Sequence, residues 1–165
     1  MIIKTNEISF EEYQKLAQRT SSTTTARDKL INGALGLCGE VNEYICERLF
    51  IEKRVREAGD VMWYIAEIAE GLGVTIADIA AVEEYGGIEI YNEAAQIADA
   101  VKKYAYQGHA IEKYDIMVGL NAIMSTITRR MIDFGYSIDD ILRGNVEKLL
   151  KRYPDGFDAE RSIHR

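Results

Sequence analysis

Proline is almost absent from this chain of 165 residues, and the one proline, Pro154, lies near the C-terminus. The residues before it contain no side chain that must break a helix, so long helices are permitted through most of the chain. Alternating runs of Val, Ile and Thr bounded by turns are also missing, and we therefore expect no β-sheet.

Cysteine is scarce as well, since Cys38 and Cys46 are the only two. If both lie on one helix, their Cα atoms are about 12 Å apart, which is beyond the reach of a disulfide. The first residues lack the apolar core of a signal peptide, and the longest apolar stretch, residues 61–74, is interrupted by Glu67 and Glu70. These absences predict a reduced, cytoplasmic protein without a membrane span.

Basic residues are outnumbered, because 20 Lys and Arg against 27 Asp and Glu give a formal net charge of −7. A nucleic-acid-binding surface needs a basic stripe, so the charge argues against a nucleic-acid partner. A nucleotide ligand remains compatible with it, since a bound divalent cation reverses the local sign. The length and ordinary composition predict one globular domain over residues 1–165.

Capping residues and glycines divide the chain into helices. Ser9 and Glu12 form a capping box that begins the first helix, and Thr75 with Asp78 caps a short helix that we expect to end at residues 86–87. Apart from this short helix, the expected helices cover about residues 10–19, 26–49, 52–71, 92–107, 110–133 and 138–151. The predicted fold class is all-α.

A weak internal repeat links the two halves of the chain. A shift of 62 positions places Gly73 on Gly135, and it makes Thr75 and Ser137 equivalent helix caps. Two amphipathic helices with glycine stops can also match at this level by chance, so both interpretations stay open.

Two acidic pairs have the spacing that places both members on one helix face. Glu40 and Glu43 are three residues apart, as are Glu57 and Asp60. If the chain reverses near residue 50, Glu40 faces Asp60. The same register places Glu43 opposite Glu57.

Four carboxylates at one level repel one another strongly unless a cation lies among them. Oxygen ligands favour a hard cation, Mg²⁺ or Mn²⁺, so Glu40, Glu43, Glu57 and Asp60 are the candidate metal ligands and catalytic residues. The alternative interpretation is a set of solvated acids on an exposed helix face.

Glycines accompany these acids. Gly36 and Gly39 precede Glu40, and Gly59 lies between Glu57 and Asp60. A glycine inside a helix costs about 1 kcal/mol relative to alanine. We interpret these glycines as points of close backbone approach or as room for a ligand.

Three segments carry a more specific pattern: residues 36–43, 57–64 and 145–157. Together they resemble the MazG-like branch of the all-α nucleoside triphosphate pyrophosphohydrolases. That family has an ExxE pair and an ExxD pair on adjacent helices, followed by an Asn, a Lys and an Arg-Tyr-Pro-x-Gly-Phe segment. The resemblance implies magnesium-dependent hydrolysis of a nucleoside triphosphate (NTP or dNTP) to the monophosphate and pyrophosphate, with Glu40 or Glu43 as general base.

The resemblance also implies residues that bind the substrate. Lys148 and Arg152, one helical turn apart, match the phosphate-contacting residues of the family, and Asn145 lies one turn earlier on the same face. Lys53 either contacts a phosphate or forms a salt bridge with Glu47 across the hairpin.

The tryptophan and the C-terminal arginines each have two possible interpretations. Trp63, the only tryptophan, either stacks on a base or lies in the core. Arg161 and Arg165 either fold back over the phosphates or belong to a free terminus.

About 60 residues separate the acidic motifs from the Asn-x-x-Lys segment, and this departs from short members of the family. The chain then resembles the fused, dUTPase-like arrangement, in which residues 10–84 carry the acids and residues 88–151 form a degenerate repeat plus the phosphate-contacting helix. We expect a four-helix-bundle-type core from two helical hairpins, the second packed on the first within the chain. The apolar positions that would meet are Leu30, Ala34, Leu37, Val41 and Ile45 in the first hairpin, and Ile97, Val101, Tyr104, Ile116, Leu120, Ile123 and Ile127 in the second. A homodimer would then add only surface contacts.

Helical bundles that carry carboxylates also serve other functions. A di-iron bundle needs Glu-x-x-His motifs, and neither His109 nor His164 has a glutamate three residues before it. The remaining alternative is a non-catalytic helical module that binds nucleotides or partners.

Overall fold

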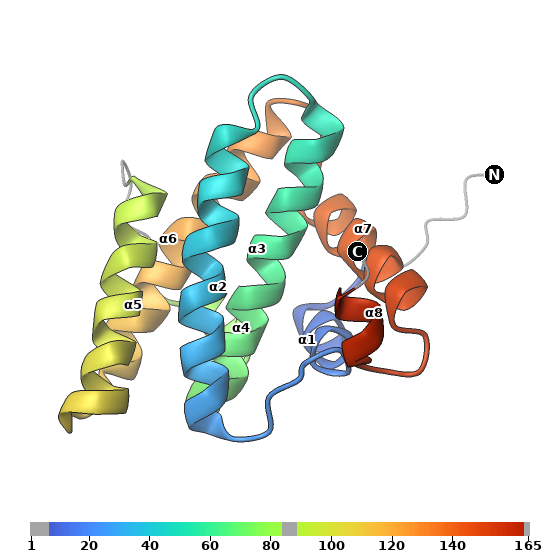
Figure 1. Cartoon of the computed structure of the whole chain (residues 1–165). Helices are drawn as coiled ribbons and strands as arrows, with labels where there is room; N and C mark the ends of the chain where they lie inside the picture. The colour runs from blue at the N-terminus through green and yellow to red at the C-terminus, as the bar shows by residue number, and fades with distance from the viewer. Residues whose placement is uncertain (1–6, 84–88, 164–165) are drawn as a thin grey trace.

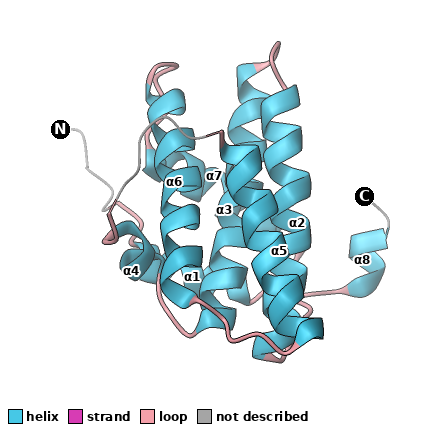
Figure 2. Cartoon of the chain, turned by 90° about the vertical axis from the view of Figure 1, so that its left-hand side faces the viewer, coloured by secondary structure: helices cyan, strands magenta, loops and turns pink. Residues whose placement is uncertain are grey.

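The computed structural model of the chain describes residues 7–83 and 89–163. These residues form eight α-helices and no strand, so the predicted all-α class is confirmed (Figure 2). The helices are α1 (Phe10–Gln18), α2 (Ala26–Cys46), α3 (Ile51–Leu72), α4 (Ile76–Ala80), α5 (Ile90–Gln107), α6 (Lys113–Ile132), α7 (Ile138–Arg152) and α8 (Ala159–Ile163).

The helix ends follow the capping chemistry of the sequence. Thr75 and Ser137, the two predicted equivalent caps, each form a complete capping box with the acid three residues later. Gly73 and Gly135 precede them with φ values of 69° and 86°, a left-handed conformation that glycine adopts without strain. The α3–α4 and α6–α7 junctions therefore share one local structure.

Three predicted boundaries differ from the structure by three residues or more. The second helix ends at Cys46 instead of residue 49, because Glu47 leaves the helical conformation and its carboxylate accepts hydrogen bonds from the backbone N–H groups of Leu49 and Phe50. The sixth helix begins at Lys113 instead of residue 110. The short fourth helix ends at Ala80, and its expected stop at residues 86–87 lies outside the described residues.

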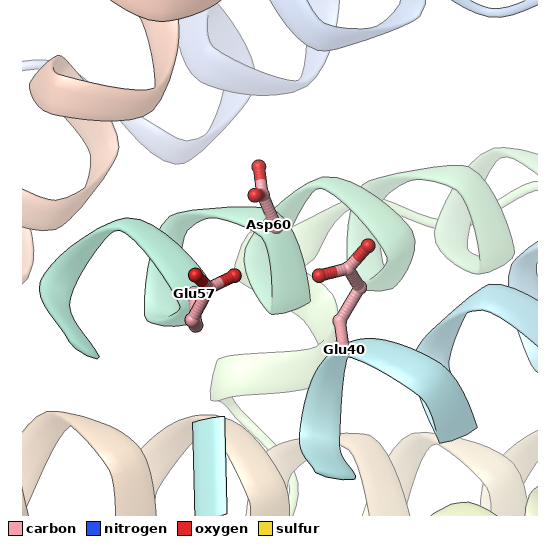
Figure 3. A group of neighbouring side chains, drawn as sticks. All are labelled: Glu40, Glu57 and Asp60. Atoms are coloured by element: carbon pink, nitrogen blue, oxygen red, sulfur yellow. The ribbon is translucent and has the colours of Figure 1, made fainter. Parts of the chain in front are cut away.

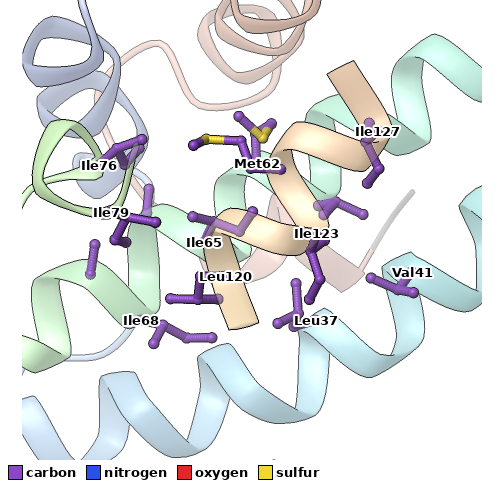
Figure 4. Packing of buried hydrophobic residues seen from close by; sticks show 14 of the residues in the cluster. Leu37, Val41, Met62, Ile65, Ile68, Ile76, Ile79, Leu120, Ile123 and Ile127 are labelled. Atoms are coloured by element: carbon purple, nitrogen blue, oxygen red, sulfur yellow. The ribbon is translucent and has the colours of Figure 1, made fainter. Parts of the chain in front are cut away.

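The four long helices contact one another in a ring. Helix α2 packs against α3 and α5, and α6 packs against the same two helices (Figure 1). Helices α5 and α6 thus pack on α2 and α3 within the chain. Figure 4 shows the apolar side chains that meet inside the ring. They include Leu37 and Val41 of α2, Ile65 and Ile68 of α3, and Leu120, Ile123 and Ile127 of α6, all buried.

A second group of helices covers the other side of α3. Helices α7 and α1 pack against α3 and against each other, with α8 following α7 (Figure 1). Helix α3 is therefore shared between the ring and this second group. Its acidic face lies where α2 and α7 approach it.

Two further observations concern the chain as a whole. Within the described residues no helix combines the length and apolarity needed to cross a membrane. Cys38 and Cys46 are both free thiols, one half-buried and the other exposed.

Candidate functional site

Three carboxylates converge between α2 and α3. Glu40 projects from α2, and Glu57 and Asp60 project from α3 (Figure 3). One oxygen of each lies within 4.8 Å of the others, and all three side chains are half-buried. The helical spacing of three residues brings Glu57 and Asp60 to one face, and the antiparallel hairpin brings Glu40 opposite them.

Glu43 does not join this group as closely as the sequence predicts. Its side chain is exposed and lies outside the set of three converging acids, although it lines the cavity into which those acids open. It is one helical turn beyond Glu40, nearer the end of α2.

The crowding of the acids raises the pKa values of two of them. Partial burial, followed by repulsion from Asp60, Glu43 and Glu57, raises the pKa of Glu40 to about 7. Burial and then Asp60 and Glu43 also raise the pKa of Glu57. Lys148 opposes both shifts. The group therefore resists full ionisation near neutral pH unless a cation compensates its charge.

Asp60 is held from the opposite side by α7. The ammonium group of Lys148 contacts both oxygens of Asp60, and Nδ2 of Asn145 donates to one of them at 3.1 Å. The buried hydroxyl of Tyr13 donates in turn to Oδ1 of Asn145 at 2.9 Å, and burial followed by the charge of Asp60 raises the pKa of Tyr13. A chain of contacts therefore fixes α7 against the acids.

Of the three glycines that accompany the acids in the sequence, two permit the close approach of neighbouring helices. A Cβ atom at Gly59 would lie 2.9 Å from Cβ of Asn145, and one at Gly36 would lie 2.0 Å from the ring of Tyr64. At Gly39 an added Cβ would meet no atom within 4 Å. Gly36 and Gly59 therefore serve backbone approach, whereas Gly39 faces open space.

This contrast gives a matched pair of substitutions. We expect Gly59→Ala to lower the free energy of unfolding by about 1–3 kcal/mol, because α7 must move away from α3. Gly39→Ala should raise it by up to about 1 kcal/mol through helix propensity. Urea unfolding of the two variants measures both effects, and equal stabilisation by both would show that α7 does not pack on Gly59.

The acids open into a cavity of about 390 Å³. Its charged lining consists of Glu40, Glu43, Glu57, Asp60, Lys148 and Arg152, and its polar and aromatic lining includes Thr20, Ser22, Asn32, Trp63 and Tyr64. Asn145 is buried and reaches the site through Asp60. The structure thus brings the predicted residues of the three segments to one cavity.

Lys53 lies elsewhere. It does not line the described cavity, and its ammonium group lies 5.0 Å from the ring centroid of Phe50. Within the described residues Glu47 and Lys53 do not form the predicted salt bridge, since the carboxylate of Glu47 accepts the backbone bonds at the start of α3.

Trp63 takes part in the packing and also lines the cavity. It is half-buried, and its Nε1 donates to the carbonyl of Ala17 at 3.2 Å and to Oγ1 of Thr20 at 2.9 Å. Its ring meets Tyr64 edge-on, with 4.9 Å between the centroids. The indole is thus part of the packing and also part of the cavity wall.

Helix α8 was not predicted, although the sequence holds a signal for it. Oδ1 of Asp158 accepts a hydrogen bond from the backbone N–H of Arg161, which is the geometry of a helix cap. The guanidinium of Arg161 donates to the carbonyl of Arg152 at 3.3 Å, so the tail folds back toward α7. Arg165 and His164 lie outside the described residues.

The fold-back creates a basic surface beside the acids. A second cavity, of about 830 Å³, shares Lys148 and Arg152 with the first and adds Arg56, Lys151 and Arg161. Acidic and basic walls therefore lie next to each other. Such a pair of walls suits a metal-bound anion.

Comparison of the chain with protein-family models, with curated proteins and with solved structures finds no match. The likeness to the MazG-like pyrophosphohydrolases remains a prediction from the three sequence segments.

Proposed function

We propose that this chain is a nucleoside triphosphate pyrophosphohydrolase of the MazG-like kind, which uses Mg²⁺, or Mn²⁺, to cleave its substrate into the monophosphate and pyrophosphate. The observation that carries the proposal is the cavity in which three converging carboxylates face Lys148 and Arg152. Acids alone are common on protein surfaces. Their combination with two cations in one cavity is what a phosphate chain accompanied by a metal ion requires.

The chemistry of the donor set fits a hard divalent cation. Glu40, Glu57 and Asp60 offer carboxylate oxygens only, and partial burial followed by repulsion from neighbouring acids raises the pKa values of both glutamates. These three residues would hold the ion, with Glu43 at the edge of the cavity. When bound, such an ion neutralises phosphate charge and lowers the pKa of a water molecule.

The protein's own groups then have separate tasks. Lys148 and Arg152 neutralise the phosphates that leave as pyrophosphate. Glu40 or Glu43 takes a proton from the attacking water, whose oxygen bonds to phosphorus while the bridging P–O bond between the α- and β-phosphates breaks. Lys148, which contacts Asp60 in the structure, must exchange this partner for a phosphate oxygen. Trp63 offers a ring edge or face to the base.

Further expectations go with this proposal. The acidic net charge argues against a nucleic-acid partner, and the free thiols agree with a reducing, cytoplasmic location. Because the second hairpin packs on the first within one chain, a homodimer would add surface contacts without completing the core.

Product analysis tests the proposal. In a panel of canonical and modified NTPs and dNTPs with Mg²⁺, we expect equal amounts of monophosphate and pyrophosphate, no diphosphate intermediate, and loss of turnover in a chelator. Ion-exchange chromatography of the nucleotides, with a pyrophosphate assay, measures both products. Stepwise release of phosphate would contradict the proposal, and binding without products would favour the non-catalytic nucleotide-binding module.

A further inference from the structure

Another carboxylate, that of Glu67, lies behind the part of the cavity wall that contains Asn32. It is 0% exposed, although it sits on α3 among the buried apolar residues Ile65 and Ile68. It is seven residues, or two helical turns, beyond Asp60, which places both acids on the same side of α3. A buried charge costs several kcal/mol unless neighbours compensate it, so its surroundings need an explanation.

Five side chains compensate Glu67. Its oxygens are contacted by Gln18 Nε2 at 3.0 Å, Ser21 Oγ at 2.9 Å, Thr23 Oγ1, Asn32 Nδ2 at 3.3 Å and Lys29 Nζ at 3.6 Å. These groups come from the end of α1, from the loop that follows it and from the first half of α2. Glu67 therefore fastens one continuous stretch of the chain, residues 18–32, to α3.

The same stretch of chain forms one wall of the cavity. Thr20 and Ser22 alternate with the residues that bind Glu67, and both line the cavity together with Asn32. Trp63, one turn before Glu67 on α3, is tied to the same loop through Thr20. Loss of Glu67 would thus release the wall without touching the acids at the other end.

Asn32 links Glu67 directly to the cavity. Because its Nδ2 donates to the carboxylate of Glu67, the opposite amide orientation is disfavoured, since Oδ1 would then meet an acceptor. The amide orientation is therefore fixed, with Oδ1 as its remaining acceptor, and Asn32 and Trp63 both line the cavity. A planar heterocycle with an N–H donor on its edge matches this pair of groups.

We infer that Glu67 is a positioning residue, which fixes Asn32 and the residue 20–23 loop as the wall that recognises the nucleobase. Selectivity among bases then arises at this wall, while the acids and Lys148 bind the phosphate chains of all nucleotides with the same affinity. This inference rests on the proposed function, because it concerns the nucleobase end of the same site.

The experiment compares Glu67→Gln and Asn32→Ala with the unchanged protein and with Asn121→Ala. Asn121 of α6 is the matched control, since it is also a buried polar side chain. It does not line the cavity, and it donates to the carbonyl of Val82, which follows α4. The only tryptophan, Trp63, lies in the wall, so its fluorescence reports binding without turnover. The probes are the four common nucleoside 5′-monophosphates and inorganic pyrophosphate, each with Mg²⁺.

For the unchanged protein we expect affinities for the four monophosphates that spread over about tenfold or more. Glu67→Gln should compress that spread to about twofold, and it should leave the affinity for pyrophosphate unchanged. Asn32→Ala should have the same effect. The double variant should show the same spread of affinities as either single variant, because the two residues act as one unit. Asn121→Ala should retain the full spread.

A Glu67→Gln variant that keeps the full spread of affinities would overturn the inference, as would an unchanged protein that binds all four monophosphates equally. In both cases pyrophosphate production would still support the proposed function. If neither nucleotide binding nor pyrophosphate production occurs, both ideas fall. Should Glu67→Gln fail to fold, Thr23→Val, which removes one donor to Glu67, carries the same comparison.

Discussion

Asp60→Asn is expected to lower kcat/KM for the nucleoside triphosphate by roughly a thousandfold. Asp60 is the residue at which the site converges, because it belongs to the group of three acids and also binds Lys148 and Asn145. The amide keeps the shape of the side chain but removes the charge that both a metal ion and Lys148 need. Steady-state kinetics together with Mn²⁺ binding by electron paramagnetic resonance measures both losses, and circular dichroism confirms that the fold is retained.

Asp99→Asn is the matched control for this experiment. Asp99 undergoes the same chemical change, but it is paired with Lys102 and Lys103 on α5, outside the acid group, and activity should persist. Glu43→Gln then tests the fourth predicted acid, which the structure places at the edge of the cavity. Full activity of Asp60→Asn would remove the acid group from the proposed mechanism.

The second large effect concerns pH. We expect the affinity for Mg²⁺ or Mn²⁺ to rise by up to about tenfold per pH unit between pH 5 and 7 and to level off above pH 7, because the ion displaces a proton from Glu40. The stability of the metal-free protein should change in the opposite direction and fall as the pH rises. The pKa of Glu40 is about 7 in the folded state, above its ordinary value of 4.5. Its contribution to the stability of the folded state is therefore full below pH 4.5 and is lost as the pH rises through 7.

Thermal unfolding in a chelator between pH 5 and 8.5 measures this loss, and added Mg²⁺ should reverse it. Glu40→Gln is the control, because a glutamine binds no proton, and its metal-free stability should depend less on pH in this range. A Glu40→Gln variant with the same pH dependence as the unchanged protein would show that other groups cause the loss.

The parts of the structure that could be predicted from sequence are those governed by local rules. Thr75 and Ser137 begin helices because each has an acid three residues later that completes its cap. Glu57 and Asp60 share a face because the helical repeat places them there. Their approach to Glu40 follows from the hairpin, since two antiparallel helices joined by a short turn leave little choice of register.

The remaining features depend on contacts between distant parts of the chain. Glu67 interrupts an apolar stretch in the sequence, and its partners Gln18 and Asn32 lie 49 and 35 positions away. Similarly, nothing local shows that Gly59 faces Asn145 whereas Gly39 faces open space. Side-chain surroundings of this kind are set by tertiary packing, which a single sequence does not display.

The contact between Lys148 and Asp60 has a thermodynamic consequence. A cation that approaches the acids alone must displace the ammonium group, and a phosphate that approaches Lys148 alone must separate it from Asp60. When both arrive together, each new partner compensates the one that is lost. Metal ion and phosphate chain are therefore coupled ligands, and by reciprocity each strengthens the binding of the other by the same factor.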